Sequence, residues 1–395
     1  MPVEPTDPIH PIHPVDPDEL ARRLALPDLS EHRDGQRPHA VALVADLLEE
    51  ALAAAWPSAV VRRDPGPRVL DLADNFDALR YRPDDATRDR RYSRYVGDGR
   101  MLRSHTSARI PVLLRTLAAQ AATGEAPAEV LLSVPGLCYR RDVVDRQHVG
   151  EPHQHDLWLV RVSGPPLGEA DLERLVAAVT GAALPGRPVT TPASPHPYTL
   201  AGREVRVDGV EVGECGLAHP EVLAAAGLPH SASGLAMGLG LDRIAMLLKG
   251  IDDIRLLRSA DPRVAAQLSD LAPYRPVSAM PPARRDLSLA VGPGDDLLDD
   301  DLLGDRVRDA LGPAAASVEE VRVLSRTPYE QVPPPARERM GMRPGQLNLL
   351  LRVVVRDLER TLTGPELDAL RDRVYAALHE GDRHEWAARQ RSAGR

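Results

Sequence analysis

The spacing of apolar residues predicts alternating helices and short strands along the first 270 residues. Apolar side chains recur at helical spacing over residues 40–55, which predicts an amphipathic helix. A second helix is expected over residues 111–122, where a proline stands in the first turn. Short β-rich runs separated by turn residues predict an antiparallel sheet. They cover residues 129–133, 136–140, 157–162, 205–212 and 235–239, and two shorter strand-like runs precede them at 60–61 and 69–72.

A polar, proline-bearing segment at residues 271–276 interrupts this pattern and predicts a domain boundary. Beyond it the pattern predicts the order strand, helix, strand, strand, helix, and Thr363 and Glu366 have the spacing of a capping box. This order is typical of a split β-α-β, ferredoxin-like module. The five elements are expected at residues 285–291, 300–311, 318–324, 347–356 and 363–378.

Length and composition are typical of a folded chain with more than one domain. The chain has 395 residues, of which 43% are hydrophobic and 27% charged, values that exclude a wholly disordered protein. The division that we expect has five parts. They are a disordered Pro/His-rich tail at 1–20, a first domain at 21–270, a linker at 271–276, a second domain at 274–385 and a C-terminal tail at 386–395.

The sequence predicts a cytoplasmic protein with no membrane partner. It contains no run of about 18 uncharged apolar residues, and its N-terminus is acidic and proline-rich, unlike a signal or transit peptide. The two cysteines, Cys138 and Cys215, are expected to be reduced core residues. The net charge of -9 neither favours nor excludes RNA, so any RNA contact would depend on local arginines.

Two stretches carry candidate chemistry. Arg140 ends a predicted strand and faces a loop with His148, an arrangement that suits a polyphosphate because guanidinium binds its oxygens in pairs. A solvated hairpin is the alternative, and His153 and His155 with Asp156 leave a metal site open. Glycines at residues 238–240 precede a helix and favour close approach of an anion. Their spacing is not that of a dinucleotide fingerprint, and the chain has no P-loop.

Together these stretches resemble the catalytic α chain of phenylalanine–tRNA ligase, a class II synthetase. The resemblance extends over about 200 residues, and residues 274–289 resemble the start of the family's ferredoxin-fold anticodon-binding domain. One chain with both parts resembles the single-chain, organellar type. The implied fold is α+β: a class II antiparallel sheet with flanking helices, then a ferredoxin-like anticodon-binding domain. The matching motifs are residues 103–107, 136–140, 153–154, Glu211 with 215–220, 238–243 and 250–255.

The resemblance implies ATP and Mg²⁺ as cofactors and assigns roles to individual residues. Arg140 would hold the ATP α-phosphate, Arg243 the γ-phosphate, and His148 would reach the phosphates from the loop, which makes these three the implied catalytic residues. The other implied ATP contacts are Asp142 at the adenine edge, Pro152 in place of an aromatic residue, Gly238, Gly240, and Glu211, which is also the implied Mg²⁺ ligand. The implied amino-acid contacts are His105, Ser107, Gln154, Asp156, Leu235 and Met237.

Several residues depart from the family pattern. Asp156 stands in place of a glutamate, and Leu235 and Met237 stand where the resemblance puts two phenylalanines that line the substrate ring. These changes imply a retuned side-chain site that activates phenylalanine poorly. In the second domain, the candidate tRNA contacts are Arg284, Arg285, Arg343 and Arg352, with a solvated salt-bridged surface as the alternative.

The resemblance therefore predicts an enzyme that forms an aminoacyl adenylate and transfers the amino acid to tRNA, acting as a monomer. One alternative is a paralogue that activates a different or non-proteinogenic amino acid, for a specialised pathway or a non-tRNA acceptor. The other is a catalytically weak binding or regulatory paralogue.

Overall fold

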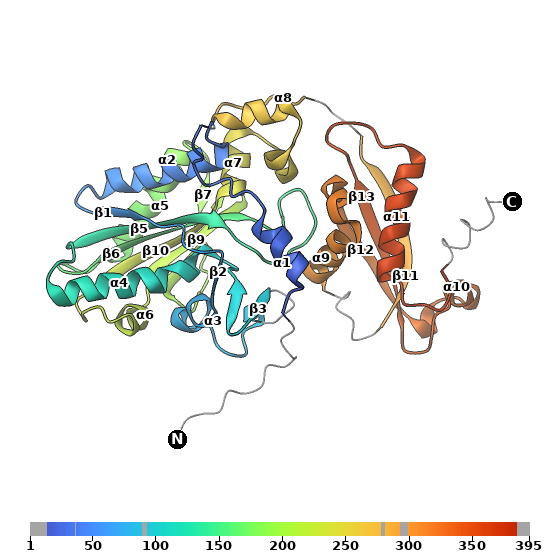
Figure 1. Ribbon diagram of the computed structural model, residues 1–395, viewed down its shortest axis with the longest axis horizontal. Coiled ribbons are helices and arrows are strands. Elements are labelled where there is room, and N and C mark those ends of the chain that lie inside the picture. The colour runs from blue at the N-terminus through green and yellow to red at the C-terminus, as the bar shows by residue number, and fades with distance from the viewer. Residues whose placement is uncertain (1–13, 36, 89–92, 278–280, 293–298, 385–395) are drawn as a thin grey trace, which may run out of the picture. The chain divides into compact units, whose positions relative to one another are not determined.

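The computed structural model describes residues 14–35, 37–88, 93–277, 281–292 and 299–384. These residues form two compact units (Figure 1). The first contains the described residues up to 140 together with 151–252 and 266–274, and the second contains 141–150, 253–265 and the described residues from 275 onward. Among the described helices, none has the length and apolar character needed to cross a membrane.

A seven-stranded sheet forms the centre of the first unit. Its order is β1-β5-β6-β10-β9-β8-β7, and only the β1–β5 pair is parallel. The predicted antiparallel sheet is therefore confirmed as the dominant feature. The strands are β1 (Val60–Arg63), β5 (Glu129–Leu137), β6 (His153–Arg161), β7 (Val189–Thr190), β8 (Thr199–Val207), β9 (Val210–Ala218) and β10 (Ser233–Gly240).

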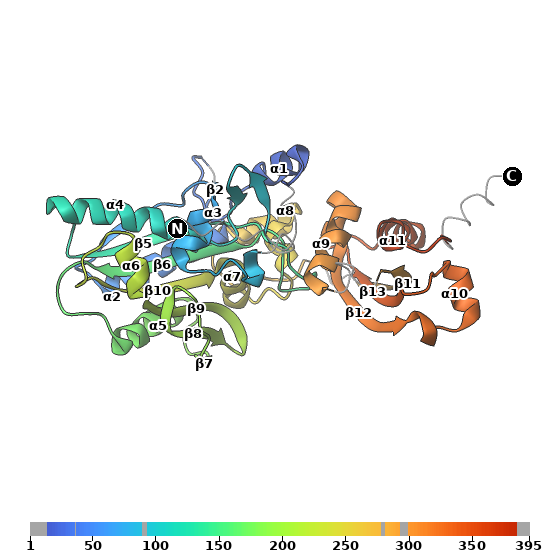
Figure 2. The ribbon, with the colours of Figure 1, turned by 90° about the horizontal axis from the view of Figure 1, so that it is seen from below.

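Helices cover both faces of this sheet, as Figure 1 and Figure 2 show. Helices α2 (Ala40–Ala55), α5 (Glu169–Ala183) and α7 (Leu241–Lys249) lie on one face. Helices α4 (Ile110–Thr123) and α6 (Pro220–Ala225) lie on the other, where Leu114, Leu117 and Val222 join one buried cluster with Trp158 and Ala236. The predicted helices over 40–55 and 111–122 are confirmed.

One predicted strand is in fact a hairpin. Residues 205–212 were expected to form one strand, but the chain turns at Asp208 and Gly209, which have φ angles of 53° and 79°, between β8 and β9. Asp-Gly is a strong signal for a two-residue hairpin, because both residues tolerate positive φ. The register then pairs Val207 with Val210.

A small antiparallel sheet lies beside the N-terminal segment of the first unit. It consists of β2 (Val69–Asp71), β4 (Arg100–Leu102) and β3 (Tyr95–Gly97), with α3 (Leu72–Asn75) following β2. Helix α1 (Pro17–Leu24) begins within the range predicted as a tail. Residues 1–13 of that tail, and the predicted C-terminal tail at 386–395, lie outside the described residues.

The second unit contains a three-stranded antiparallel sheet with the order β11-β13-β12. The predicted order strand, helix, strand, strand, helix is present, and the capping box of Thr363 and Glu366 is confirmed. Helices α9 and α11 pack on one face of the sheet in a single buried cluster. The elements are β11 (Ala283–Val291), α9 (Asp300–Leu311), β12 (Val318–Pro328), α10 (Pro334–Met340), β13 (Leu347–Val355) and α11 (Gly364–Leu378), preceded by α8 (Pro262–Ala265).

The loop between β5 and β6 belongs to this second unit. Val144, at the middle of the loop, is 7% exposed and lies in the same buried cluster as α9 and α11. Its carbonyl oxygen accepts a hydrogen bond from the Val321 N–H at 2.9 Å, and the guanidinium of Arg146 binds the Glu319 carboxylate. The loop is therefore a packed part of the fold.

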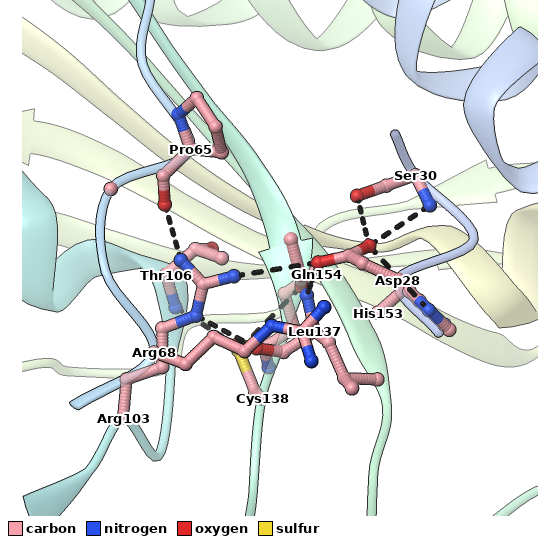
Figure 3. Close-up of polar contacts among 12 residues, drawn as sticks. Asp28, Ser30, Pro65, Arg68, Arg103, Thr106, Leu137, Cys138, His153 and Gln154 are labelled. Carbon is pink, nitrogen blue, oxygen red and sulfur yellow. Dashed lines mark hydrogen bonds and ion pairs between the residues drawn. The ribbon is translucent and has the colours of Figure 1, made fainter. Parts of the chain in front are cut away.

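A buried arginine, Arg103, holds the end of β5 (Figure 3). Its Nε donates to the Leu137 carbonyl oxygen at 2.7 Å, and its Nη1 donates to the Pro65 carbonyl oxygen. The Asp28 carboxylate accepts from the Leu137 N–H at 2.7 Å and lies 3.7 Å from the guanidinium. Both charged side chains are 1% exposed, so removing one would leave the other charge uncompensated.

The Arg103 guanidinium occupies the space that a side chain at Gly136 would need. A Cβ atom there would lie 1.8 Å from Nη2 of Arg103, and that group is already held by two carbonyl oxygens. We therefore expect Gly136→Ala to lower the free energy of unfolding by about 1–3 kcal/mol, the usual cost of overpacking. Urea unfolding, followed by circular dichroism, measures this change.

The matched control is Gly181→Ala in α5, where no atom lies within 4 Å of the added Cβ. Alanine favours helix over glycine, so this variant should be as stable as the unmodified protein or more stable. Equal stability of the two variants would contradict the role assigned to Arg103.

Candidate active site

Strand alternation brings one set of polar residues to a single face of the seven-stranded sheet. On β6, Gln154, Asp156 and Trp158 share a face because side chains alternate along a strand. Asp156 pairs with Gly238 of β10, and Gln154 pairs with Gly240. Directly paired residues point to the same side, so these glycines lie on the same face, called the Asp156 face below.

Leu235 and Met237 lie on the opposite face, which corrects the expectation that they contact the amino acid. Met237 pairs with Leu157, the neighbour of Asp156 along β6, and neighbours along a strand point to opposite sides. Both side chains are buried, at 0% and 1% exposure, on the face covered by α2, α5 and α7. They therefore cannot contact a ligand that binds at Asp156.

The Asp156 carboxylate is buried and surrounded by donors. It accepts hydrogen bonds from Thr106 Oγ1 at 2.7 Å and from Trp158 Nε1 at 3.1 Å. Burial raises the pKa of Asp156 to about 6, and the nearby Glu214 carboxylate acts in the same direction, whereas Thr106, Ser107 and Trp158 oppose the rise. The group is thus ionised at neutral pH and suited to an ammonium ion.

His105 and Arg140 lie close to the same face. Burial, and to a smaller extent the charge of Arg140, lowers the pKa of His105 to about 4. Neither ring nitrogen makes a well-formed hydrogen bond, although the Asn75 backbone lies near enough to favour the protonated form. His105 is therefore a neutral imidazole at pH 7. Gln154 is held nearby, because its Oε1 accepts from the Thr106 N–H at 3.3 Å.

Aromatic side chains that the sequence analysis did not identify line this region. Trp158 stacks on Tyr198 with ring centroids 6.0 Å apart, and Tyr81 lies 6.2 Å from Tyr198 and 5.7 Å from His105. Burial, followed by the charges of Glu214 and Asp156, raises the pKa of the Tyr81 hydroxyl. The rings are thus neutral.

Arg243 and Glu211 are brought together at the start of α7. The guanidinium Nη1 of Arg243 lies 3.1 Å from the Glu211 carbonyl oxygen and 3.4 Å from its Oε2. Gly240 is the N-cap residue of that helix, and the exposed fraction of the Glu211 side chain is 44%. Within the part of the chain that the structure describes, no group of three or more His, Cys, Asp or Glu side chains is placed to hold a metal ion.

Asp142 and His148 lie on the β5–β6 loop, which belongs to the second unit. The Arg308 guanidinium donates to the Asp142 carbonyl oxygen at 2.6 Å, and His148 Nδ1 lies 2.7 Å from the Asp145 carboxylate. Pro152 is placed just before β6, where its carbonyl oxygen accepts from the Cys138 N–H at 2.8 Å.

Carboxylates pair with most of the arginines that were expected to contact tRNA. Arg352 binds Asp286 through two hydrogen bonds of 2.8 Å. Arg285 lies 3.2 Å from Asp368 and Arg343 lies 2.6 Å from Asp382, while Arg284 is exposed. Three of these four arginines therefore have a carboxylate partner in the structure.

Comparison with known proteins identifies a family for the part of the chain that contains the seven-stranded sheet. The family model "tRNA synthetases class II core domain (F)" matches residues 35–268, more than half of the chain. The phenylalanine–tRNA ligase alpha subunit of Prochlorococcus marinus (strain MIT 9313) is 37% identical over 207 residues, which cover 51% of this chain and 58% of the relative. The alpha subunit of Nostoc punctiforme is 35% identical over 207 residues, and the alpha subunit of Synechocystis sp. is 34% identical over 209 residues. Each of these two matches covers 51% of this chain and 59% of the relative.

The chain thus spans less than two thirds of the length of these relatives, at 58–59%. The relatives are named as alpha subunits, so they give no support to the expectation of a monomer. The family match covers β1 to β10 and every residue assigned above to the Asp156 face. The chain belongs to the family of tRNA synthetases with a class II core domain (F).

Proposed function

We propose that the protein activates an amino acid with ATP and transfers it to tRNA, as a phenylalanine–tRNA ligase-like enzyme. The observation that carries this proposal is the grouping of an ionised buried carboxylate, a neutral imidazole and a guanidinium on one sheet face. Asp156 would bind the α-ammonium group, while His105 and Arg140 lie where they could contact the carboxylate. Gln154 and Ser107 complete the set.

In the proposed reaction, an oxygen of the amino-acid carboxylate attacks the α-phosphorus of ATP, and pyrophosphate leaves. Arg140 would stabilise the negative charge that develops on the α-phosphate, and a positioned cation is effective there because it needs no reorganisation. A hydroxyl of the terminal tRNA ribose then attacks the carbonyl carbon, and AMP leaves. Arg243 would bind the distal phosphates.

ATP and Mg²⁺ fit the residues on this face. Gly238 and Gly240 leave the backbone open to a nucleotide, and Pro152 stays a proposed neighbour of the adenine. Mg²⁺ commonly binds through one or two carboxylates and the substrate phosphates, so Glu211, with its exposed carboxylate, would hold it. The ion would neutralise phosphate charge. Asp142 stays a proposed contact of the adenine, and His148 a proposed contact of the phosphates.

For the second unit we propose a ferredoxin-like, anticodon-binding role, which would make this a single-chain synthetase of cytoplasmic location. Its element order and its β11-β13-β12 sheet support the fold. Arg284, Arg285, Arg343 and Arg352 remain the proposed tRNA contacts.

A second candidate is a paralogue that activates an amino acid other than phenylalanine. The stacked rings of Trp158 and Tyr198, with Trp158 at 0% exposure, fill the apolar part of the Asp156 face. A carboxylate, Glu214, lies nearby. These observations favour a polar substrate over an aromatic one.

We expect Arg140→Ala to abolish amino-acid-dependent pyrophosphate exchange while the protein stays folded. Loss of one group that stabilises transition-state charge costs about 10²–10³ in rate. Exchange and thermal melting are measured together, with Arg115→Ala as control, because Arg115 forms only a surface ion pair with Asp74. Exchange at the normal rate in Arg140→Ala would contradict the assignment.

The KM for the amino acid should rise as the pH falls through about 6, because Asp156 must be ionised to bind an ammonium group. Above that pH the KM should be constant. Stability has the opposite dependence: the folded state binds this proton more tightly than the unfolded state, so the contribution of Asp156 is full below its ordinary pKa of 3.8 and is lost as the pH rises through about 6.

The control for this pH dependence is Asp156→Asn, which should have a high KM that does not change between pH 5 and 8. His105 does not interfere, because its pKa is about 4. A pH profile that is identical in the two proteins would show that another group titrates.

Binding of tRNA should weaken when Arg284 and Arg352 are both replaced by alanine. Each lost phosphate contact lowers the slope of log K against log salt by about 0.7–0.9, which fluorescence titration at several salt concentrations measures. Arg263→Ala is the control, since Arg263 is an exposed arginine of the same unit that pairs with Asp261. An unchanged slope in the double variant would locate the tRNA elsewhere.

A further inference from the structure

Two acidic side chains flank a glycine on the Asp156 face. Gly238 pairs with Asp156 of β6 on one side and with Glu214 of β9 on the other. Neighbouring strands lie about 4.8 Å apart, so the backbones of the two acidic residues are about 10 Å apart. No side chain stands between them along this row, because the central residue is glycine.

The Glu214 side chain lies on the Asp156 face, because Glu214 pairs directly with Gly238. Burial is the largest cause of the raised pKa of Asp156, Tyr81 and Tyr198, and the charge of Glu214 contributes to the rise at all three. The side chain of Glu214 is 39% exposed, and its Oε2 lies 2.7 Å from Nε2 of His196. The carboxylate is thus held in place and is still accessible to a ligand.

In the next row of paired residues on this face, aromatic rings occupy the space beside Asp156. Trp158 pairs with Ala236, which in turn pairs with Gly216, so this row has small residues beside one indole. The indole is fixed by its hydrogen bond to Asp156 and by stacking on Tyr198. A ligand whose ammonium group binds Asp156 would contact these rings on the side of Trp158. Its side chain would instead extend over Gly238 toward Glu214.

We propose that Glu214 selects an amino acid whose side chain ends in a cationic amino group, that is, a diamino acid. The inference rests on the proposed function and identifies the substrate class of that site. An ω-ammonium group would form a charge-assisted hydrogen bond with Glu214. A benzyl or isobutyl side chain would remove water from the Glu214 carboxylate and offer it no hydrogen-bond donor in return. Binding of such a substrate would therefore carry a desolvation cost.

The test uses full-length protein and amino-acid-dependent pyrophosphate exchange. The probes are L-2,3-diaminopropionate, L-2,4-diaminobutyrate, L-ornithine, L-leucine and L-phenylalanine. We expect at least one diamino acid to give a kcat/KM about tenfold or more above leucine and phenylalanine, since a site built around a polar partner discriminates strongly against analogues that lack it. Because the three diamino acids differ by one methylene at a time, a single optimum should mark the distance to Glu214.

Glu214→Gln should raise the KM for the preferred diamino acid by about tenfold or more and leave kcat nearly unchanged, because the interaction holds the side chain and not the reacting atoms. The matched control is Glu169→Gln, which also removes one charge and one ion pair, with Arg203, at the surface of the same unit. Its KM should not change.

Equal or better exchange with leucine or phenylalanine would overturn this inference and leave the proposed function standing. An unchanged KM in Glu214→Gln would also overturn it, and would make the His196–Glu214 ion pair structural. Failure of exchange with all five probes and with the twenty standard amino acids would overturn the proposed function itself. If Glu214→Gln does not fold, the comparison of probes on the unmodified protein still decides the matter.

Discussion

The site depends on the buried guanidinium of Arg103 and its hold on the end of β5. This side chain binds the carbonyl oxygen of Leu137, whose N–H is bound by Asp28. Burial would raise the pKa of Asp28, but His153, Ser30 and the Leu137 N–H outweigh it and hold the pKa below its usual value. The charge pair therefore persists at neutral pH, and it fixes the strand from which Arg140 emerges.

The same network orients β6 and α7. The backbone N–H of His153 donates to the Asp242 carboxylate at 2.7 Å. Nε2 of the His153 ring accepts from the Leu29 N–H at 3.0 Å. Gln154 and Asp156 follow His153 directly along β6. The positions of the groups proposed to bind ammonium and phosphate are thus set by polar contacts deep in the first unit, rather than by the groups themselves.

Much of the fold and part of the site follow from the sequence because they depend on local patterns. Helical periodicity found α2 and α4, and alternation along β6 and β10 puts Gln154, Asp156 and Gly238 on one face. Alternation along β10 alone separates Leu235 and Met237 from Gly238, but only the β6–β10 register shows that Gly238 shares the face of Asp156. Glu214 and Tyr198 could not be found this way, because their places depend on pairing between β8, β9 and β10.

The β5–β6 loop shows a second limit of local patterns. Its residues can be interpreted either as a phosphate-binding loop or as a solvated hairpin, and neither interpretation predicts that Val144 packs into the core of the second unit and that Arg308 binds the loop backbone. Only long-range packing determines this outcome. The same holds for Arg352, whose partner Asp286 lies 66 positions away.

The most direct measurement is a crystal structure of the protein with a non-hydrolysable aminoacyl-sulfamoyl adenosine whose amino acid supports exchange. The account predicts that the α-ammonium group lies within hydrogen-bond distance of Asp156 and that the side chain crosses Gly238 toward Glu214. An analogue bound on the face that carries Leu235 and Met237, or one whose ammonium group makes no contact with Asp156, would contradict it.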